Sequence, residues 1–121
     1  MMLLTPDIRA RLVANALEGD ADHVPVAKFF NPMGAGVWLP AYLSGDGDTL
    51  FGIADLEMGC PEYGSFSLAE LQGLDTGLGL GIERDILFET RTRMSIWLDI
   101  AKTAGSVRKA ECIIDRLERE C

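Results

Sequence analysis

Three carboxylates lie close together in the chain, and they are the side chains best suited to chemistry: Asp55, Glu57 and Glu62. In an extended segment Asp55 and Glu57 point to the same side, so both could face one ligand. Carboxylate oxygens bind hard cations such as Mg²⁺ and also serve as general acid and base. One interpretation is therefore a metal-dependent hydrolase in which Arg84 steadies an anionic transition state.

The same residues also have a structural interpretation. Arg84 alternates with Ile82 and Ile86 and so lies on the apolar face of a predicted strand. A guanidinium on such a face requires a partner, because an unpaired buried charge is costly. We therefore predict an ion pair between Arg84 and either Asp55 or Glu62.

Other catalytic patterns have little support in the sequence. The single histidine, His23, could pair with Cys60 only if two distant segments met, and Ser65 does not lie in a Gly-x-Ser-x-Gly elbow. The alternating glycines of segment 77–81 lack the spacing of a dinucleotide-binding fingerprint. No cofactor and no metal site of histidine and cysteine ligands is predicted.

The charge pattern limits the class of partner. No lysine or arginine occurs between Lys28 and Arg84, and the formal net charge is −8. Such a field repels nucleic-acid phosphates and attracts basic protein patches, so we expect a basic protein surface as partner and no direct nucleic-acid binding. The predicted binding surface consists of seven carboxylates: Asp46, Asp48, Asp55, Glu57, Glu62, Glu83 and Asp85.

Length and composition are those of an ordinary globular domain, so one domain over residues 1–121 is expected. The N-terminus has no cationic region before an apolar run, as a signal peptide would have. The longest uncharged stretch, residues 29–45, is too short and too broken by proline and glycine to span a bilayer. We therefore expect a cytoplasmic protein without a membrane segment.

The first half of the chain predicts one helix and three strands. Thr5 and Pro6 open a helix that ends at Gly19, and a strand follows over 24–30. Segments 36–43 and 49–56 form a hairpin around the turn Ser44–Asp48. Pro40 cannot donate a ladder hydrogen bond, so it predicts an edge strand or a bulge.

The second half predicts a short helix opened by a capping box of Ser67 and Glu70, a strand over 82–88 and two helices. The first of these helices covers 94–104 with Ile96, Trp97 and Ile100 as its buried stripe, and the second follows Ser106. Strands and helices do not alternate regularly. The predicted fold is therefore α+β, an antiparallel sheet of about four strands with helices packed on one side.

These segments resemble a bacterial family known only as domain of unknown function 2958. The resembling runs cover about residues 3–98 and leave 101–121 as a C-terminal helical extension; they are 4–6, 22–32, 47–56, 59–62 with 67–71, and 79–85. The resemblance implies no activity. It implies a genetic context, since such domains are encoded on plasmids and integrated elements, in some cases near antirestriction genes.

Charge and context together give two functional hypotheses. The first is a small non-enzymatic accessory protein of mobile genetic elements that binds a basic protein, such as a host defence nuclease or complex, by imitating the charge of DNA. The alternative is the hydrolase described above, with Asp55, Glu57, Glu62 and Arg84 as its site. The hydrolase requires the three carboxylates to converge, whereas the binding protein requires them to be exposed.

Overall fold

The computed structural model describes residues 2–19 and 21–120 and shows an α+β fold, as predicted. Five antiparallel strands form one sheet in the order β4-β3-β2-β1-β5. The elements are α1 (Pro6–Glu18), β1 (Phe29–Phe30), β2 (Val37–Leu43), β3 (Thr49–Asp55), β4 (Glu62–Ser67), α2 (Leu68–Gly73), β5 (Glu83–Arg84), α3 (Met94–Ala104) and α4 (Val107–Glu120).

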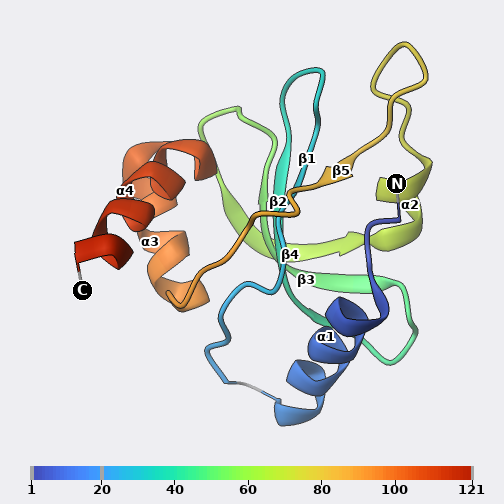
Figure 1. Cartoon of the computed structure of the whole chain (residues 1–121), viewed down its shortest axis with the longest axis horizontal. Coiled ribbons are helices and arrows are strands. Elements are labelled where there is room, and N and C mark those ends of the chain that lie inside the picture. The colour runs from blue at the N-terminus through green and yellow to red at the C-terminus, as the bar shows by residue number, and fades with distance from the viewer. Residues whose placement is uncertain (1, 20, 121) are drawn as a thin grey trace.

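Helices cover both faces of this sheet, which differs from the single covered face that was expected (Figure 1). The strands alternate apolar side chains to both sides, so each face needs a cover. One core joins α1 and α2 to the sheet and includes Leu12, Phe29, Trp38, Leu50 and Leu71. The other joins α3 and α4 to the opposite face and includes Val37, Ile53, Trp97, Val107 and Ile114.

The predicted hairpin is confirmed, and its turn is closed by Asp46. The Asp46 carboxylate accepts hydrogen bonds from the backbone of Asp48 and Thr49 and from the Thr49 hydroxyl at 2.6–2.8 Å. These bonds, led by the Thr49 hydroxyl, hold the Asp46 pKa well below its usual value. In β2 the pairing shifts between Pro40 and Tyr42, so the proline marks a bulge in the central strand and not an edge.

Two predicted strands are much shorter in the structure. Segment 24–30 pairs as a strand only at Phe29–Phe30, although the Val26 N–H donates to the Pro40 carbonyl at 2.9 Å. Segment 82–88 is a strand only at Glu83–Arg84, after which the Asp85 carboxylate accepts from the Leu87 N–H in a turn. These two short strands, β1 and β5, pair with each other through only two residue pairs, Phe29 with Arg84 and Phe30 with Glu83.

The last two helices form as predicted, and the C-terminal segment packs on the sheet. Gly105 adopts the left-handed conformation with a φ of 93° and ends α3, and the Ser106 hydroxyl accepts from the Lys109 N–H at 3.1 Å to begin α4. Trp97 is buried as expected. Ile96 is exposed, however, because the helix turns Met94 and Ala101 toward the sheet in its place.

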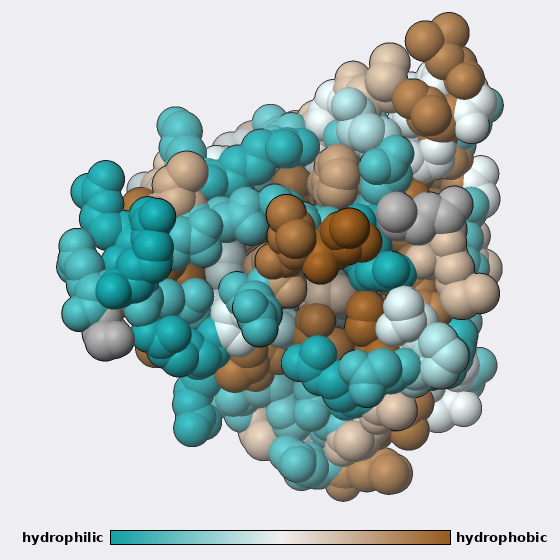
Figure 2. Space-filling model, viewed as in Figure 1, coloured by the Kyte–Doolittle hydropathy of each residue, from teal (hydrophilic) through white to brown (hydrophobic). Residues whose placement is uncertain are grey.

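Apolar side chains also reach the surface. Figure 2 shows them at the tip of the loop between α2 and β5 and in a second group near the middle of the same face. Among the large apolar residues that the structure describes, Leu78 and Leu87 are the most exposed, at 91% and 86%. Among the described residues no helix has the length and apolar character needed to cross a membrane.

Candidate functional site

The seven carboxylates of the predicted binding surface lie in three separate places. Asp46 and Asp48 are at the β2–β3 turn, whereas Asp55, Glu57 and Glu62 are at the other end of β3, about 20 Å away along the strand. The remaining two, Glu83 and Asp85, lie at β5 on the far edge of the sheet. The sequence-predicted surface is therefore not one continuous patch.

Asp55 is fully buried and serves as an anchor for α4. One carboxylate oxygen accepts from the backbone N–H of Val107, the first residue of that helix, at 2.7 Å. The other oxygen accepts from the Glu57 N–H, also at 2.7 Å. The negative charge at the helix N-terminus is further stabilised by the helix dipole. Asp55 is thus enclosed in the fold and contributes nothing to an exposed binding surface.

Glu57 lies in a loop that fastens β3 to the last helix. It adopts a positive φ of 61°, which is uncommon for a residue with a side chain. Its carboxylate accepts a hydrogen bond from the Arg108 guanidinium, and the same guanidinium donates to the Gly34 carbonyl at 3.3 Å. Figure 1 shows this loop beside the beginning of α4. The charge of Glu57 is therefore partly neutralised within the chain.

Glu62 is the carboxylate of this group that stays exposed. No hydrogen bond or ion pair joins its side chain to another residue in 2–19 or 21–120. It lies at the beginning of β4 beside a hollow of about 320 Å³. Apolar and polar side chains share the lining, and they include Leu56, Met58, Cys60 and Tyr63. This hollow combines a free carboxylate with exposed apolar surface.

The predicted ion pair of Arg84 with Asp55 or Glu62 is wrong. Arg84 and Glu62 lie in one cross-strand row but on opposite edge strands, four strand spacings or about 19 Å apart. Asp55 belongs to the neighbouring row and so points to the opposite face of the sheet. The Arg84 guanidinium instead donates to the carbonyls of Met2 and Leu3 at 2.6 and 3.0 Å. Arg84 therefore binds the N-terminal segment to β5.

The geometry does not assemble the hydrolase site either. Both oxygens of Asp55 already accept backbone hydrogen bonds, and Glu57 is paired with Arg108. Within the described part of the chain, no three histidine, cysteine, aspartate or glutamate side chains are grouped so as to hold a metal ion. The convergence that the hydrolase interpretation requires is absent from these residues.

Lys28, the last cation before the acidic stretch, is nearly buried under α4. Its ammonium lies 2.7 Å from a carboxylate oxygen of Glu111 and 3.6 Å from one of Asp85. It also lies 6.0 Å from the centre of the Phe30 ring, on the same face of the sheet. Asp85 is thus partly engaged inside the chain, and Lys28 is not available to a partner.

His23 and Cys60 line different hollows and do not form a nucleophile–base pair. His23 is buried next to Tyr42 in a hollow of about 250 Å³ under α3, and its Nε2 has no hydrogen-bond partner among the described residues. Its Nδ1 lies 3.8 Å from a carboxylate oxygen of Glu18. Cys60 is exposed in the β3–β4 loop. Tyr63 lines both of these hollows. Burial raises the pKa of Tyr63, and the nearby Tyr42 adds to this effect.

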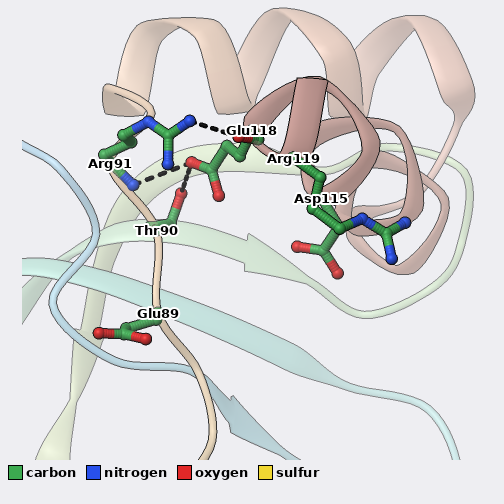
Figure 3. Close-up of a pocket in the computed structure, with 6 residues that line it drawn as sticks. All are labelled: Glu89, Thr90, Arg91, Asp115, Glu118 and Arg119. Carbon is green, nitrogen blue, oxygen red and sulfur yellow. Dashed lines mark hydrogen bonds between the residues drawn. The ribbon is translucent and has the colours of Figure 1, made fainter. Parts of the chain in front are cut away.

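A larger hollow of about 480 Å³ lies where the segment before α3 meets the end of α4 (Figure 3). One Glu118 oxygen accepts from the hydroxyls of Thr90 and Thr92 at 2.7 Å and from the N–H groups of Arg91 and Thr92 at 2.9 and 3.0 Å. The Arg91 guanidinium also donates to the Glu118 carbonyl. These bonds to one carboxylate oxygen and to the Glu118 carbonyl fasten the C-terminal helix to the segment before α3. We therefore assign Glu118 a structural role.

Replacing Glu118 with glutamine is expected to lower the free energy of unfolding by about 1 to 2 kcal/mol at neutral pH, because the one oxygen that accepts these four bonds would lose its negative charge and bind the donors more weakly. Burial would raise the Glu118 pKa, but the Thr92 and Thr90 hydroxyls and the two backbone donors outweigh it and lower the pKa. A lowered folded-state pKa stabilises the protein above the unfolded-state value and loses this effect on acidification.

Urea unfolding at neutral and acid pH checks this prediction. The difference between wild type and Glu118→Gln is expected to shrink as the pH falls below about 4.5, the ordinary value for glutamate, and toward the lowered folded-state pKa. Glu120→Gln, at the exposed end of the same helix, is the matched control and is expected to change little. A pH-independent difference would contradict the assigned role of the carboxylate.

A family model described as protein of unknown function, DUF2958, matches residues 3–108. The chain belongs to this family. The match extends past the part recognised from the sequence, through α3 and into the first turn of α4, where Val107 meets Asp55. Neither a curated protein nor a solved structure matches the chain. The family assignment thus supports the resemblance seen in the sequence and brings no activity with it.

The strand β4, which begins with the exposed carboxylate of Glu62, was not predicted from the sequence. No strand was predicted over Glu62–Ser67, where Gly64 disfavours a strand and Ser67 was assigned to the capping box of the next helix. A signal for this strand was available in the sequence. Tyr63, Ser65 and Ser67 alternate with Phe66, as expected of a strand, and the segment pairs with the predicted strand β3. In this DUF2958 member, β4 is the element that joins Glu62 to the exposed apolar surface.

Proposed function

We propose that this DUF2958 protein is a non-enzymatic binding module for a basic protein surface. The observation that carries the proposal is the β3–β4 end of the sheet, where Glu62 is exposed without a partner among the described residues. Next to it, Leu56 and Met58 are 53% and 78% exposed. Apolar surface around a charged group is typical of interaction sites, and single-sign charge selects an oppositely charged partner.

The acidic stretch supports the same proposal beyond Glu62. Residues 29–83 form β1 to β4 and α2 without one lysine or arginine of their own. Arg108 of α4 pairs with Glu57, which leaves Glu62 for an incoming basic group. The hydrogen bonds that lower the Asp46 pKa keep that turn charged. The structure reduces the available charge, however, since Asp55 is buried and Glu57 and Asp85 have partners.

The family resemblance suggests the kind of partner. In an accessory protein of mobile genetic elements, a defence nuclease or surveillance complex of the host is the basic partner that this context favours, because such proteins bind DNA in positively charged grooves. The protein would then act against host defence by occupying such a groove. This part of the proposal rests on charge and context, and no catalytic group is needed for it.

Affinity capture from a bacterial host lysate tests the proposed function. The wild-type bait is expected to retain a basic protein at low salt and to lose it at high salt, because exposed charges are screened. Glu62→Lys is expected to lose the same protein, whereas Glu120→Lys makes an equal change in net charge at the far end of α4 and is expected to retain it. Equal capture by all three baits, or no capture at low salt, would refute the proposal.

A further inference from the structure

Among residues 2–19 and 21–120, the strand β4 pairs with β3 alone and lies at the end of the strand order, so its outer edge is free there. The Leu68 N–H donates to the Asp48 carbonyl at 2.9 Å, one step beyond the β3–β4 ladder. Hydrogen-bonded and non-bonded pairs alternate in an antiparallel ladder, so the even-numbered residues of β4 bond to β3. Tyr63 and Ser65 therefore turn their N–H and C=O groups away from the sheet.

Apart from the single charge of Glu62, this edge lacks the usual protections. Edge strands are commonly blocked by lysine, by proline, by a bulge or by being very short. The six residues of β4 contain no lysine and no proline, and their pairing with β3 has no register shift. The opposite edge strand, β5, has only two residues. Of the two edges of the described sheet, β4 is therefore the one that can accept another strand.

We propose that β4 receives an extended basic segment of the partner protein as an added strand; this inference rests on the proposed binding function and specifies how the partner binds. Backbone groups of the segment would pair with those of Tyr63 and Ser65. A lysine or arginine of the segment would meet Glu62, and an apolar side chain would enter the hollow of about 320 Å³ beside Met58. Strand addition supplies affinity, and these two contacts supply specificity.

Charge decides the occupant of this edge. A second copy of the chain would bring another lysine-free β4 and another Glu62 to the interface, and each copy carries a net charge of −8. Two surfaces of the same sign repel each other, and neither β4 offers a cation to the other copy's Glu62. A segment with alternating basic and apolar residues instead places its charges near Glu62 and leaves its backbone extended. The surface thus selects a basic strand over self-association.

The test uses the full chain and a blocked peptide of alternating lysine and valine, with an alternating glutamate and valine peptide for comparison. Ser65→Pro removes one outward N–H without removing a ladder bond to β3, and Ser65→Ala is its matched control. The lysine peptide is expected to bind wild type and Ser65→Ala and to bind Ser65→Pro about tenfold more weakly or worse. The glutamate peptide is expected not to bind.

Hydrogen exchange of the wild-type protein gives a second readout that does not depend on the variant. The bound lysine peptide is expected to slow exchange of the Tyr63 and Ser65 amides. Salt-sensitive binding without this protection, and with equal affinity for Ser65→Pro, would overturn strand addition while leaving a charged binding surface. No binding of the lysine peptide at low salt would overturn strand addition, whereas failure of the capture experiment would overturn the proposed binding function. A dimer that Ser65→Pro dissociates would identify a second copy as the occupant and overturn the basic partner.

Discussion

Replacing Asp55 with alanine is expected to lower the free energy of unfolding by roughly 2 to 4 kcal/mol. The substitution leaves the buried N–H of Val107 and the N–H of Glu57 without their acceptor, and each lost acceptor at a buried site is costly. It also removes a negative charge from the N-terminus of α4. Because Val107 is in the core that joins α4 to the sheet, the loss affects the packing of the whole helix.

Chemical denaturation of Asp55→Ala, Asp55→Asn and Asp115→Ala measures this effect. Asparagine keeps one acceptor oxygen but presents an amide nitrogen to the second donor, so its cost is expected to lie between those of wild type and alanine. Asp115 is exposed on α4, and its replacement is expected to change the free energy of unfolding by no more than about 0.5 kcal/mol. An unchanged unfolding midpoint in Asp55→Ala would show that Asp55 does not anchor the helix.

The local signals of the sequence predicted the elements that depend on neighbouring residues. Thr5 accepts from the Ile8 N–H at 3.2 Å and opens α1, and Ser67 accepts from the Glu70 N–H at 3.1 Å and opens α2. Gly105 ends α3 in the left-handed conformation. Each of these features is decided by side chains within a few positions of one another, which is why the sequence alone predicts them.

The site could not be predicted in the same way, because its contacts join distant segments. The partner of Asp55 is 52 residues further along the chain, and no residue near Asp55 indicates that α4 begins there. The ion pair with Arg84 failed for a similar reason. Alternation correctly assigns residues to the two sides of one strand, but strand order decides which strands are neighbours and which side meets which helix.

The free edge of β4 combines a property that the sequence predicts with one that it does not. Its acidic character followed from the absence of lysine and arginine between Lys28 and Arg84, which is a property of sequence alone. Its position at the end of the sheet follows from β3 being paired on its other side with β2. A charge pattern therefore indicated the class of partner, whereas only the sheet order showed where a partner could bind.

Replacing Gly52 with alanine is expected to lower the free energy of unfolding by roughly 3 kcal/mol. A Cβ atom at this position would lie 2.0 Å from the Leu39 carbonyl oxygen and 2.8 Å from the Pro40 Cα. Both contacts are with backbone, so the strands would have to separate at the place where β2 is bulged between Pro40 and Tyr42. A glycine in a strand interior is required where another backbone approaches so closely.

Gly64→Ala is the matched control, because Gly64 is the cross-strand partner of Gly52 and no atom lies within 4 Å of its added Cβ. It is expected to stabilise the protein by about 0.4 to 1 kcal/mol, since alanine has fewer conformations to lose when the chain folds. Thermal or urea unfolding of the two variants would then shift the midpoint in opposite directions. Equal shifts would mean that the close approach of β2 to β3 does not control this position. Because Gly64 bonds inward to β3, the same variant should leave the outer edge of β4 able to bind the lysine peptide.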